Sequence, residues 1–600
     1  MSKNQELAQL FSKAADVMAL LDENSFRVLA TRKVARALEE LGQDVSTLSE
    51  SGKLEEISGI GKHSAEKIRE YLRTGHITEF ESLAKQVPTG VLDLLAVGSI
   101  GAKTAYLLWK EAGITSLDEL KAALEKGKIP SIKGLGEKKL ARIRQNLEFI
   151  QGQGKRIGIG VALPVARQLC DALRELAGVK NVQYCGSLRR GLETIGDVDI
   201  LLSAPNSKMP AITEFIKSHT DTAEVIAAGE TKVSIRTKSL LQVDFRVVPP
   251  ESWGAALQYF TGSKEHNVRV REMAIKKGMK LNEWGLYKGE KSIAGLTEVD
   301  IYDALELAWL PPEMREDRGE VELASAMYQV RKNPKFVVDN PKLEFLGKHI
   351  PTSWPELQIS DIQADLHMHT TASDGTLSLE DMVAEAKRRG RKYIAITDHS
   401  KSQVQANGLK VDRLMEHIKA IHALAAKTKG ITVLAGSEVD ILADGSLDYP
   451  DEVLEKLDWV VASPHAALTQ ESEAATARLI RVASNPLVDV IGHPTGRLVA
   501  VRRGLEPDMQ RVIFAAARGG VALEINAHDL RLDLRDVHVR MAVEAGVPLC
   551  INTDAHGAAD MDNLIYGVIT ARRGWARAQN VLNTWPLEKM LKWQKERGKN

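Results

Sequence analysis

Short apolar runs that end in a histidine or a carboxylate recur along the last part of the chain, and they limit its fold more than any other feature. Segments with the apolar spacing of helices separate these runs. Such an alternation predicts repeated βα units, which form a parallel sheet or a barrel. The predicted strands are Tyr393–Asp398, Ile431–Val439, Trp459–Ser463, Val488–Gly492, Val521–Asn526 and Val547–Thr553.

Residue types that bind metals gather at the ends of these predicted strands. His367 and His369 alternate around Met368, so both imidazoles face one side of a strand. A single histidine of this kind is more often a hydrogen-bonded structural residue. Nine candidates at equivalent strand ends instead predict a centre for Zn, Mn or Fe ions. They are His367, His369, Asp374, His399, Glu438, His465, His493, Asp554 and His556.

The first 150 residues are predicted to be helical, for example over Gln5–Leu21 and Ser25–Leu41. Three glycine turns in this region each precede a helix and a lysine. A single turn is more often a simple helix connection, but three favour backbone N–H groups that bind DNA phosphates. The third turn is the weakest case. The turns contain Gly59, Gly61 and Lys62; Gly98, Gly101 and Lys103; and Gly134, Gly136 and Lys138.

A mixed α+β pattern follows, with strands predicted at Val182–Cys185, Val198–Leu202, Lys232–Ile235 and Leu241–Val248. Asp197 and Asp199 alternate along one strand and Asp244 lies in another. Three acids on adjacent strands predict a two-metal site for phosphoryl transfer, with Mg²⁺ or Mn²⁺ as the ions. Upstream, Gly186 is predicted to form a turn that a phosphate can approach closely. Ser187 and Arg190 are predicted to bind the phosphates through a hydroxyl and a positive charge.

Composition excludes several other classes. Eighty Lys and Arg balance 80 Asp and Glu, so the net charge gives no indication of nucleic-acid binding. The three cysteines form no CxxC pair, which excludes a disulfide framework and a thiolate zinc site. No signal peptide or apolar span is evident, so we expect a soluble cytoplasmic protein. Prolines at 334, 341, 351 and 355 predict an interdomain linker over 326–358.

The motifs of the first 320 residues, taken together, resemble those of family X DNA polymerases. The resemblance implies a sugar pocket at Tyr259, Phe260 and Gly262, and contacts with the nascent pair and template from Asn267 and Arg271. It also places Lys67 where some relatives carry a Schiff-base lysine, although a lysine that holds a 5'-phosphate is an equal alternative. Gln242 and Lys264 depart from the residues found in some members.

The histidine series resembles the PHP (polymerase and histidinol phosphatase) domain over about 361–575. The resemblance implies a distorted (β/α)7 barrel with three metals. One metal takes His367, His369, Glu438 and Asp554; Glu438 bridges to a second held by His465 and His493; Asp374, His399 and His556 hold the third. Arg497 and Arg531 are candidate phosphate clamps, with solvated loop arginines as the alternative of equal weight.

The two resemblances imply a monomeric repair polymerase that binds gapped or nicked DNA, adds dNTPs, and trims 3' ends at the PHP site. Relatives with this architecture are associated with 3'-5' exonuclease and abasic-site endonuclease activity. Two alternatives remain open: a PHP phosphoesterase whose front half only delivers DNA, and a non-catalytic repair scaffold. The expected domains are a lyase-like helical domain (1–85), a fingers-like helical domain (86–150), a palm (151–250), a thumb (251–325), the linker (326–358) and the PHP domain (359–600).

Overall fold

The computed structural model describes most of the chain, which divides near residue 154 into two compact units. The described residues are 3–333, 354 and 357–597. Within the first of these ranges, residues 40, 42–43, 58, 98–99, 131, 133, 138, 142, 145–146 and 148–155 lie outside the description. No described helix is long and apolar enough to cross a membrane.

The described part of the first unit consists of helices and turns without a strand, which confirms the helical prediction. Helix α1 is central because its apolar face packs against the helices around it, and Phe11 meets Phe80 edge to face at 4.9 Å. The helices are α1 (Lys3–Leu20), α2 (Ser25–Glu39), α3 (Val45–Glu50), α4 (Lys62–Thr74), α5 (Thr78–Ala84), α6 (Thr89–Asp93), α7 (Ala102–Ala112) and α8 (Leu117–Glu125).

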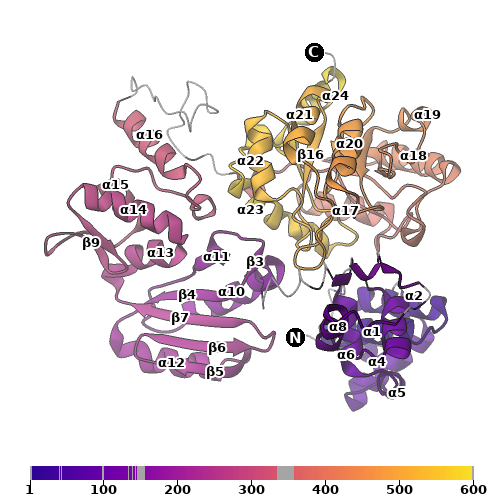
Figure 1. Ribbon diagram of the computed structural model, residues 1–600, viewed down its shortest axis with the longest axis horizontal. Coiled ribbons are helices and arrows are strands. Elements are labelled where there is room, and N and C mark those ends of the chain that lie inside the picture. The colour runs from indigo at the N-terminus through magenta and orange to yellow at the C-terminus, as the bar shows by residue number, and fades with distance from the viewer. Residues whose placement is uncertain are drawn as a thin grey trace. The chain divides into compact units, whose positions relative to one another are not determined.

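The second unit begins with a five-stranded sheet of order β2-β4-β7-β6-β5, shown in magenta in Figure 1. Strands β4 and β7 are parallel neighbours at its centre, whereas the other pairs are antiparallel. The elements are β1 (Ile157–Gly158), α10 (Ile159–Arg174), β2 (Asn181–Tyr184), α11 (Gly186–Arg189), β3 (Thr194–Ile195), β4 (Val198–Ser203), α12 (Met209–Ser218), β5 (Thr222–Ala228), β6 (Lys232–Thr237) and β7 (Gln242–Val248).

A helical segment with a three-stranded antiparallel sheet comes next. Its elements are α13 (Trp253–Thr261), α14 (Lys264–Lys276), β8 (Lys280–Asn282), β9 (Gly285–Lys288), β10 (Lys291–Ala294), α15 (Glu298–Ala304) and α16 (Glu320–Lys332). Helix α16 continues past residue 326, where the sequence predicts the linker to begin, because its buried face ending at Met327 packs on the apolar core of this segment. The four linker prolines lie outside the described residues.

Seven parallel strands in sequential order, β11 to β17, form the last part. Beyond β11 and β17, Met368 pairs with Ala555 in a parallel bridge, which brings the two edges together as in a barrel. Helices surround these strands (Figure 1). The predicted βα barrel is thus confirmed, with β11 (Ala364–Asp365), β12 (Tyr393–Ile396), β13 (Thr432–Asp440), β14 (Trp459–Ser463), β15 (Val490–Ile491), β16 (Ala522–Asn526) and β17 (Leu549–Asn552).

The barrel has two apolar layers. One lies between strands and outer helices, and the other fills the barrel interior, where Trp459 and Tyr393 are fully buried beneath Met590 of the last helix. Tyr393 and Trp459 are the first residues of their strands, so the last helix covers the amino-terminal end of the barrel. The carboxyl-terminal end of the barrel is left for function. The helices are α17 (Leu379–Arg388), α18 (Val411–Ala425), α19 (Asp451–Leu454), α20 (Ser472–Ala483), α21 (Met509–Gly519), α22 (Asp536–Glu544), α23 (Leu564–Arg573) and α24 (Leu587–Glu596).

Candidate active sites and metal centres

The three predicted acids of the five-stranded sheet come together. Asp199 on β4 and Asp244 on β7 are direct partners in the parallel register, and Asp197 directly precedes β4. Asp197 is exposed, Asp199 half-buried and Asp244 buried. Because side chains two residues apart on an extended chain share a face, the sheet presents three carboxylates on one surface.

The electrostatics of this acid triad fit a bound cation. Burial, followed by the charges of Asp197 and Asp244, raises the pKa of Asp199 to about 6. Burial also opposes ionisation of Asp244, but hydrogen bonds, first from Lys232, hold its pKa below the usual range. The ammonium nitrogen of Lys232 lies 2.6 Å from Asp244 Oδ2. Divalent cations would relieve the repulsion among these acids and suit their oxygen ligands.

The predicted phosphate loop lies directly against the acid triad. Gly186 begins α11 with φ +62°, and a Cβ atom there would come within 2.8 Å of Asp199 Oδ2, so only glycine fits without a shift. Arg190 follows α11, and its Nε lies 3.0 Å from Glu316 Oε1. Its Nη1 donates to the carbonyl of Thr261. Ser187 lies between these two residues in the same short helix.

The residues of the expected sugar pocket lie at the junction of α13 and α14. Tyr259 and Phe260 meet edge to face at 5.2 Å, and Gly262 ends α13 with φ +71°. Asn267 is buried and its amide donates to the carbonyl of Tyr259 at 2.8 Å. Arg271 is exposed on α14.

The histidines and acids of the barrel lie at or just beyond the carboxyl ends of its strands. His367 and His369 follow β11 rather than lying within it, and the parallel bridge of Met368 holds them. His399, His465 and His493 each follow a strand, as do Asp554 and His556, whereas Glu438 lies in the last part of β13. All nine predicted ligands therefore approach one end of the barrel.

Glu438 lies at the centre of this cluster. Its Oε1 lies 3.3 Å from His367 Nε2, 3.3 Å from His465 Nε2 and 2.8 Å from His493 Nε2. Its Oε2 lies 2.7 Å from His399 Nδ1. Glu438 is fully buried, and the surrounding imidazoles hold its pKa far below the usual range despite the burial.

Three groupings within the cluster have ligand atoms within 4.8 Å of one another. His369 belongs to two of them and His399 to two, so the groupings overlap more than the three ligand sets that the resemblance implies. His493 is outside these groupings but contacts Glu438. The groupings are His369, Asp374, His399 and His556; His367, His369 and Asp554; and His399, Glu438 and His465.

Several polar atoms of the predicted ligands are buried without a hydrogen bond among the described residues, namely His367 Nε2, His369 Nδ1 and His493 Nδ1. His399 Nδ1 and Glu438 Oε2 lie 2.7 Å apart but without the alignment of a hydrogen bond. Buried polar atoms are normally satisfied, so orphaned nitrogens beside carboxylates fit metal ligation. The pKa of His369 falls to about 4 through burial and then the charges of neighbouring histidines. The pKa of His465 instead rises to about 9, because the carboxylates of Glu438 and Asp440 outweigh the effect of its burial.

Sequence reasoning missed Glu524, a fully buried acid in the middle of β16. It accepts hydrogen bonds from His367 Nδ1 at 2.7 Å, from the backbone N–H of His493 at 2.7 Å and from Asn552 Nδ2 at 2.9 Å. An acid between the apolar residues Leu523 and Ile525 of a predicted strand was the signal for it. In the same way, Asp440 lies 2.7 Å from His465 Nδ1. Such partners orient ligating imidazoles.

We expect Glu524→Gln to weaken divalent-cation binding by about 10- to 100-fold, as for other partners of metal-ligating histidines. Donors approach both carboxylate oxygens of Glu524, so an amide NH₂ would face a donor whichever way it turned. Competition between the full-length protein and a chromogenic chelator for Mn²⁺ measures the effect. Glu416→Gln, an exposed change on α18, is the matched control. Equal affinities in the two variants would contradict the orienting role.

Arg497 is not the free phosphate clamp that the sequence left open. Its guanidinium is buried and pairs with both oxygens of Glu193, at 3.0 and 2.6 Å, and it also donates to the carbonyl of Leu532. Glu193 follows the phosphate loop, so Arg497 binds the two parts of the unit together. Arg531 remains a candidate phosphate clamp, because its Nε lies 3.4 Å from Asp554 Oδ2 in the cluster of predicted metal ligands.

Two of the glycine turns lead directly into helices whose first turns have no side-chain cap. Gly61 and Gly101 are the N-caps of α4 and α7, and neither helix start has a side-chain cap. First-turn N–H groups are therefore open to an anion, with Lys62 and Lys103 exposed beside them. In the third turn Gly134 has φ +95° and Gly136 accepts the first helical hydrogen bonds. Gly98 and Lys138 lie outside the described residues.

Lys67 lies on α4 with 22% of its side chain exposed. Its ammonium is 3.1 Å from Glu79 and 5.8 Å from the centre of the Phe80 ring. Glu79 also binds Arg27 at 2.6 Å. Lys67 thus belongs to a small ion-pair cluster between helices.

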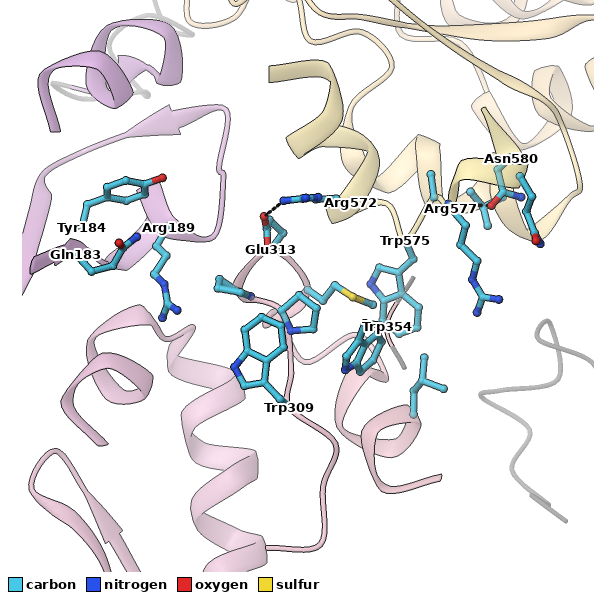
Figure 2. A pocket seen from close by; sticks show the side chains of 17 residues that line it. Gln183, Tyr184, Arg189, Trp309, Glu313, Trp354, Arg572, Trp575, Arg577 and Asn580 are labelled. Atoms are coloured by element: carbon cyan, nitrogen blue, oxygen red, sulfur yellow. Dashed lines mark hydrogen bonds and ion pairs between the residues drawn. The ribbon is translucent and has the colours of Figure 1, made fainter. Parts of the chain in front are cut away.

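A cavity of about 470 Å³ is separate from the acids and histidines described above. Figure 2 shows Trp309, Trp354 and Trp575 along its wall, with Arg572 paired to Glu313 at 3.1 Å. None of the predicted catalytic or metal-binding residues lines it.

Family models match along most of the chain. Their descriptions are a helix-hairpin-helix domain (residues 2–77), a SAM-like helix-hairpin-helix tandem (91–148), the DNA polymerase beta palm (164–242), the DNA polymerase beta thumb (256–316) and a PHP domain (365–528).

Three of the similar proteins show which parts of the chain are shared. The DNA polymerase/3'-5' exonuclease PolX of Bacillus subtilis is 37% identical over 97% of this chain and 98% of its own length. DNA polymerase lambda of Rattus norvegicus is 27% identical over 52% of this chain and 55% of its own length. A probable phosphatase of Thermoanaerobacter sp. is 29% identical over 37% of this chain and 89% of its own length.

Proposed function

Because this chain belongs to the family X DNA polymerases that carry a PHP domain, we propose that it fills short gaps during DNA repair and removes 3'-terminal nucleotides. The observation that carries the proposal is the parallel pairing of Asp199 with Asp244 beside Asp197, together with a second, separate cluster around Glu438. One chain with two such centres can both extend and shorten a primer.

Asp197, Asp199 and Asp244 are the proposed holders of Mg²⁺ or Mn²⁺ at the polymerase centre. Bound there, the ions supply activation of a 3'-hydroxyl and neutralise charge on the triphosphate. The N–H groups at Gly186, the hydroxyl of Ser187 and the guanidinium of Arg190 are proposed to orient the phosphates. The proposed sugar pocket consists of Tyr259, Phe260 and Gly262, with Asn267 and Arg271 beside the nascent pair.

The barrel cluster is proposed to bind three divalent ions, drawn from Mn²⁺, Zn²⁺ and Fe²⁺. His and carboxylate ligands suit these ions, which supply a hydroxide at neutral pH when bound. Glu524 and Asp440 hold two of the imidazoles in place. Arg531 is proposed to bind the phosphate of the scissile bond, and abasic-site cleavage is a further activity proposed for this centre.

Gapped or nicked DNA is the proposed partner, bound through the glycine turns at Gly61, Gly101 and Gly136, with dNTPs as substrates. Contacts with phosphates do not need a basic surface overall, which is consistent with the zero net charge. Lyase chemistry at Lys67 is a secondary proposal. We also propose a cytoplasmic monomer. An inactive front half or a non-catalytic scaffold is disfavoured because both sets of ligands are intact.

A labelled primer on a duplex with a one-nucleotide gap tests the function. With Mn²⁺ or Mg²⁺ we expect extension by one nucleotide when dNTPs are present and shortening from the 3' end when they are absent. Excess chelator serves as the control and should stop both reactions. Shortening without extension under either metal would favour the phosphoesterase alternative, and the absence of both reactions would favour the scaffold.

A further inference from the structure

We propose that Arg573, the last residue of barrel helix α23, is a positioning residue for dNTP binding at the polymerase centre. The proposal rests on the role proposed above for Arg190. It makes the PHP part of the chain a contributor to nucleotide addition as well as a site of hydrolysis.

Arg573 is buried and reaches the phosphate loop directly. Its Nη1 donates to the backbone carbonyl of Arg190 at 2.6 Å and lies 3.0 Å from Glu316 Oε1. Its Nη2 lies 2.7 Å from Asp536 Oδ2 on α22. A buried guanidinium with three fixed acceptors is held in one orientation, so it fixes the position of the carbonyl that it binds.

The same Glu316 oxygen also holds the side chain of Arg190. Arg190 Nε lies 3.0 Å from Glu316 Oε1, and its Nη1 donates to the carbonyl of Thr261 at 2.6 Å. Among the described residues, Arg190 Nη2 has no hydrogen-bond partner. Glu316 and Thr261 thus set the plane of the guanidinium and leave one of its nitrogens to face a ligand.

Close packing supports these polar contacts. A Cβ atom at Gly191 would lie 2.2 Å from the Cγ2 atom of Ile569 on α23, so the loop and this helix are in tight contact. Two residues further on, Glu193 forms its two-point ion pair with Arg497. The phosphate loop and the residues that follow it, as far as 193, are therefore held to the barrel both by apolar packing and by an ion pair.

Loss of Arg573 changes the environment of Arg190 in a definite direction. Glu316 would no longer be shared between two guanidinium groups and could pair with Arg190 alone. A two-point pair of that kind would turn Nη2 toward Glu316, because arginine and carboxylate groups prefer parallel hydrogen bonds. The triphosphate would then lose a positive contact that it needs for binding, whereas the acid triad would stay as it is.

The test compares Arg573→Ala with Arg572→Ala in the full-length protein. Arg572 is the neighbouring residue on α23, and its polar partners among the described residues are Glu313, as Figure 2 shows, and the carbonyl of Leu357, both outside the phosphate loop. In single-nucleotide gap filling we expect Arg573→Ala to raise the KM for dNTP about tenfold, the effect of losing one charged hydrogen bond, with kcat within about twofold. Arg572→Ala should leave the KM within about twofold.

Further variants separate positioning from general destabilisation. Arg573→Lys should recover part of the affinity. Glu316→Gln added to Arg573→Ala should lower the raised KM again, because the carboxylate that would capture Arg190 is then absent. Degradation of a 3' overhang should stay unchanged in all of these variants. Equal KM values in Arg573→Ala and Arg572→Ala would overturn the proposal. If Arg573→Ala fails to fold, an unchanged KM in Arg573→Lys would overturn it. An unchanged KM in Arg190→Ala would instead refute the proposed role of Arg190.

Discussion

Asp199→Asn is expected to lower nucleotide incorporation by at least about a thousandfold, because a metal-ion contribution of several kcal/mol corresponds to a rate factor of that size. Asp199 lies between the other two acids, and its raised pKa of about 6 reflects burial and their charges. The amide keeps the shape of the side chain but lacks the negative charge that a divalent cation requires.

The measurement is single-nucleotide gap filling with saturating Mn²⁺, in parallel with degradation of a 3' overhang. We expect degradation to stay within about twofold of the unaltered protein, because Asp199 belongs to the five-stranded sheet and not to the barrel. Asp171→Asn, an exposed change on α10, is the matched control. Normal gap filling by Asp199→Asn would show that the acid triad is not the polymerase centre.

The fold was predictable wherever apolar residues alternate or cluster clearly. Strands β4 and β7 were expected within a residue or two of their ends, because both are buried over most of their length. Strand β5 (Thr222–Ala228) was missed, since it is an edge strand with almost every residue exposed, and its apolar residues follow one another without the alternation that marks a half-buried strand. The short hairpins β8 to β10 carry equally little hydrophobic signal.

The ligand types of the barrel site were predictable because each stands at the end of an apolar run. Their mutual distances were not, since His369 and His399 each join two groupings only after the strands close into a barrel. The structural role of Arg497 could not be predicted from the sequence either. Its partner Glu193 is 304 residues away in the sequence, so a local motif cannot distinguish a phosphate clamp from an ion pair.

Glu438→Gln is expected to lower 3'-5' degradation by about a thousandfold or more and to reduce the number of divalent ions bound per chain. The carboxylate faces the imidazoles of His367, His399, His465 and His493, and its neutral amide would lose both the negative charge and two-point ligation. Elemental analysis of the purified protein counts the ions, and the 3'-overhang assay measures the rate.

Glu452→Gln, an exposed change on α19, is the control for this variant. Gap filling should stay within about twofold in both, because Glu438 and the acid triad belong to different sheets. A thermal unfolding scan checks that the buried amide has not unfolded the barrel. If Glu438→Gln lost its ions but still degraded 3' ends at the normal rate, the hydrolytic centre would have to lie outside the barrel cluster, and the acid triad would be the remaining candidate.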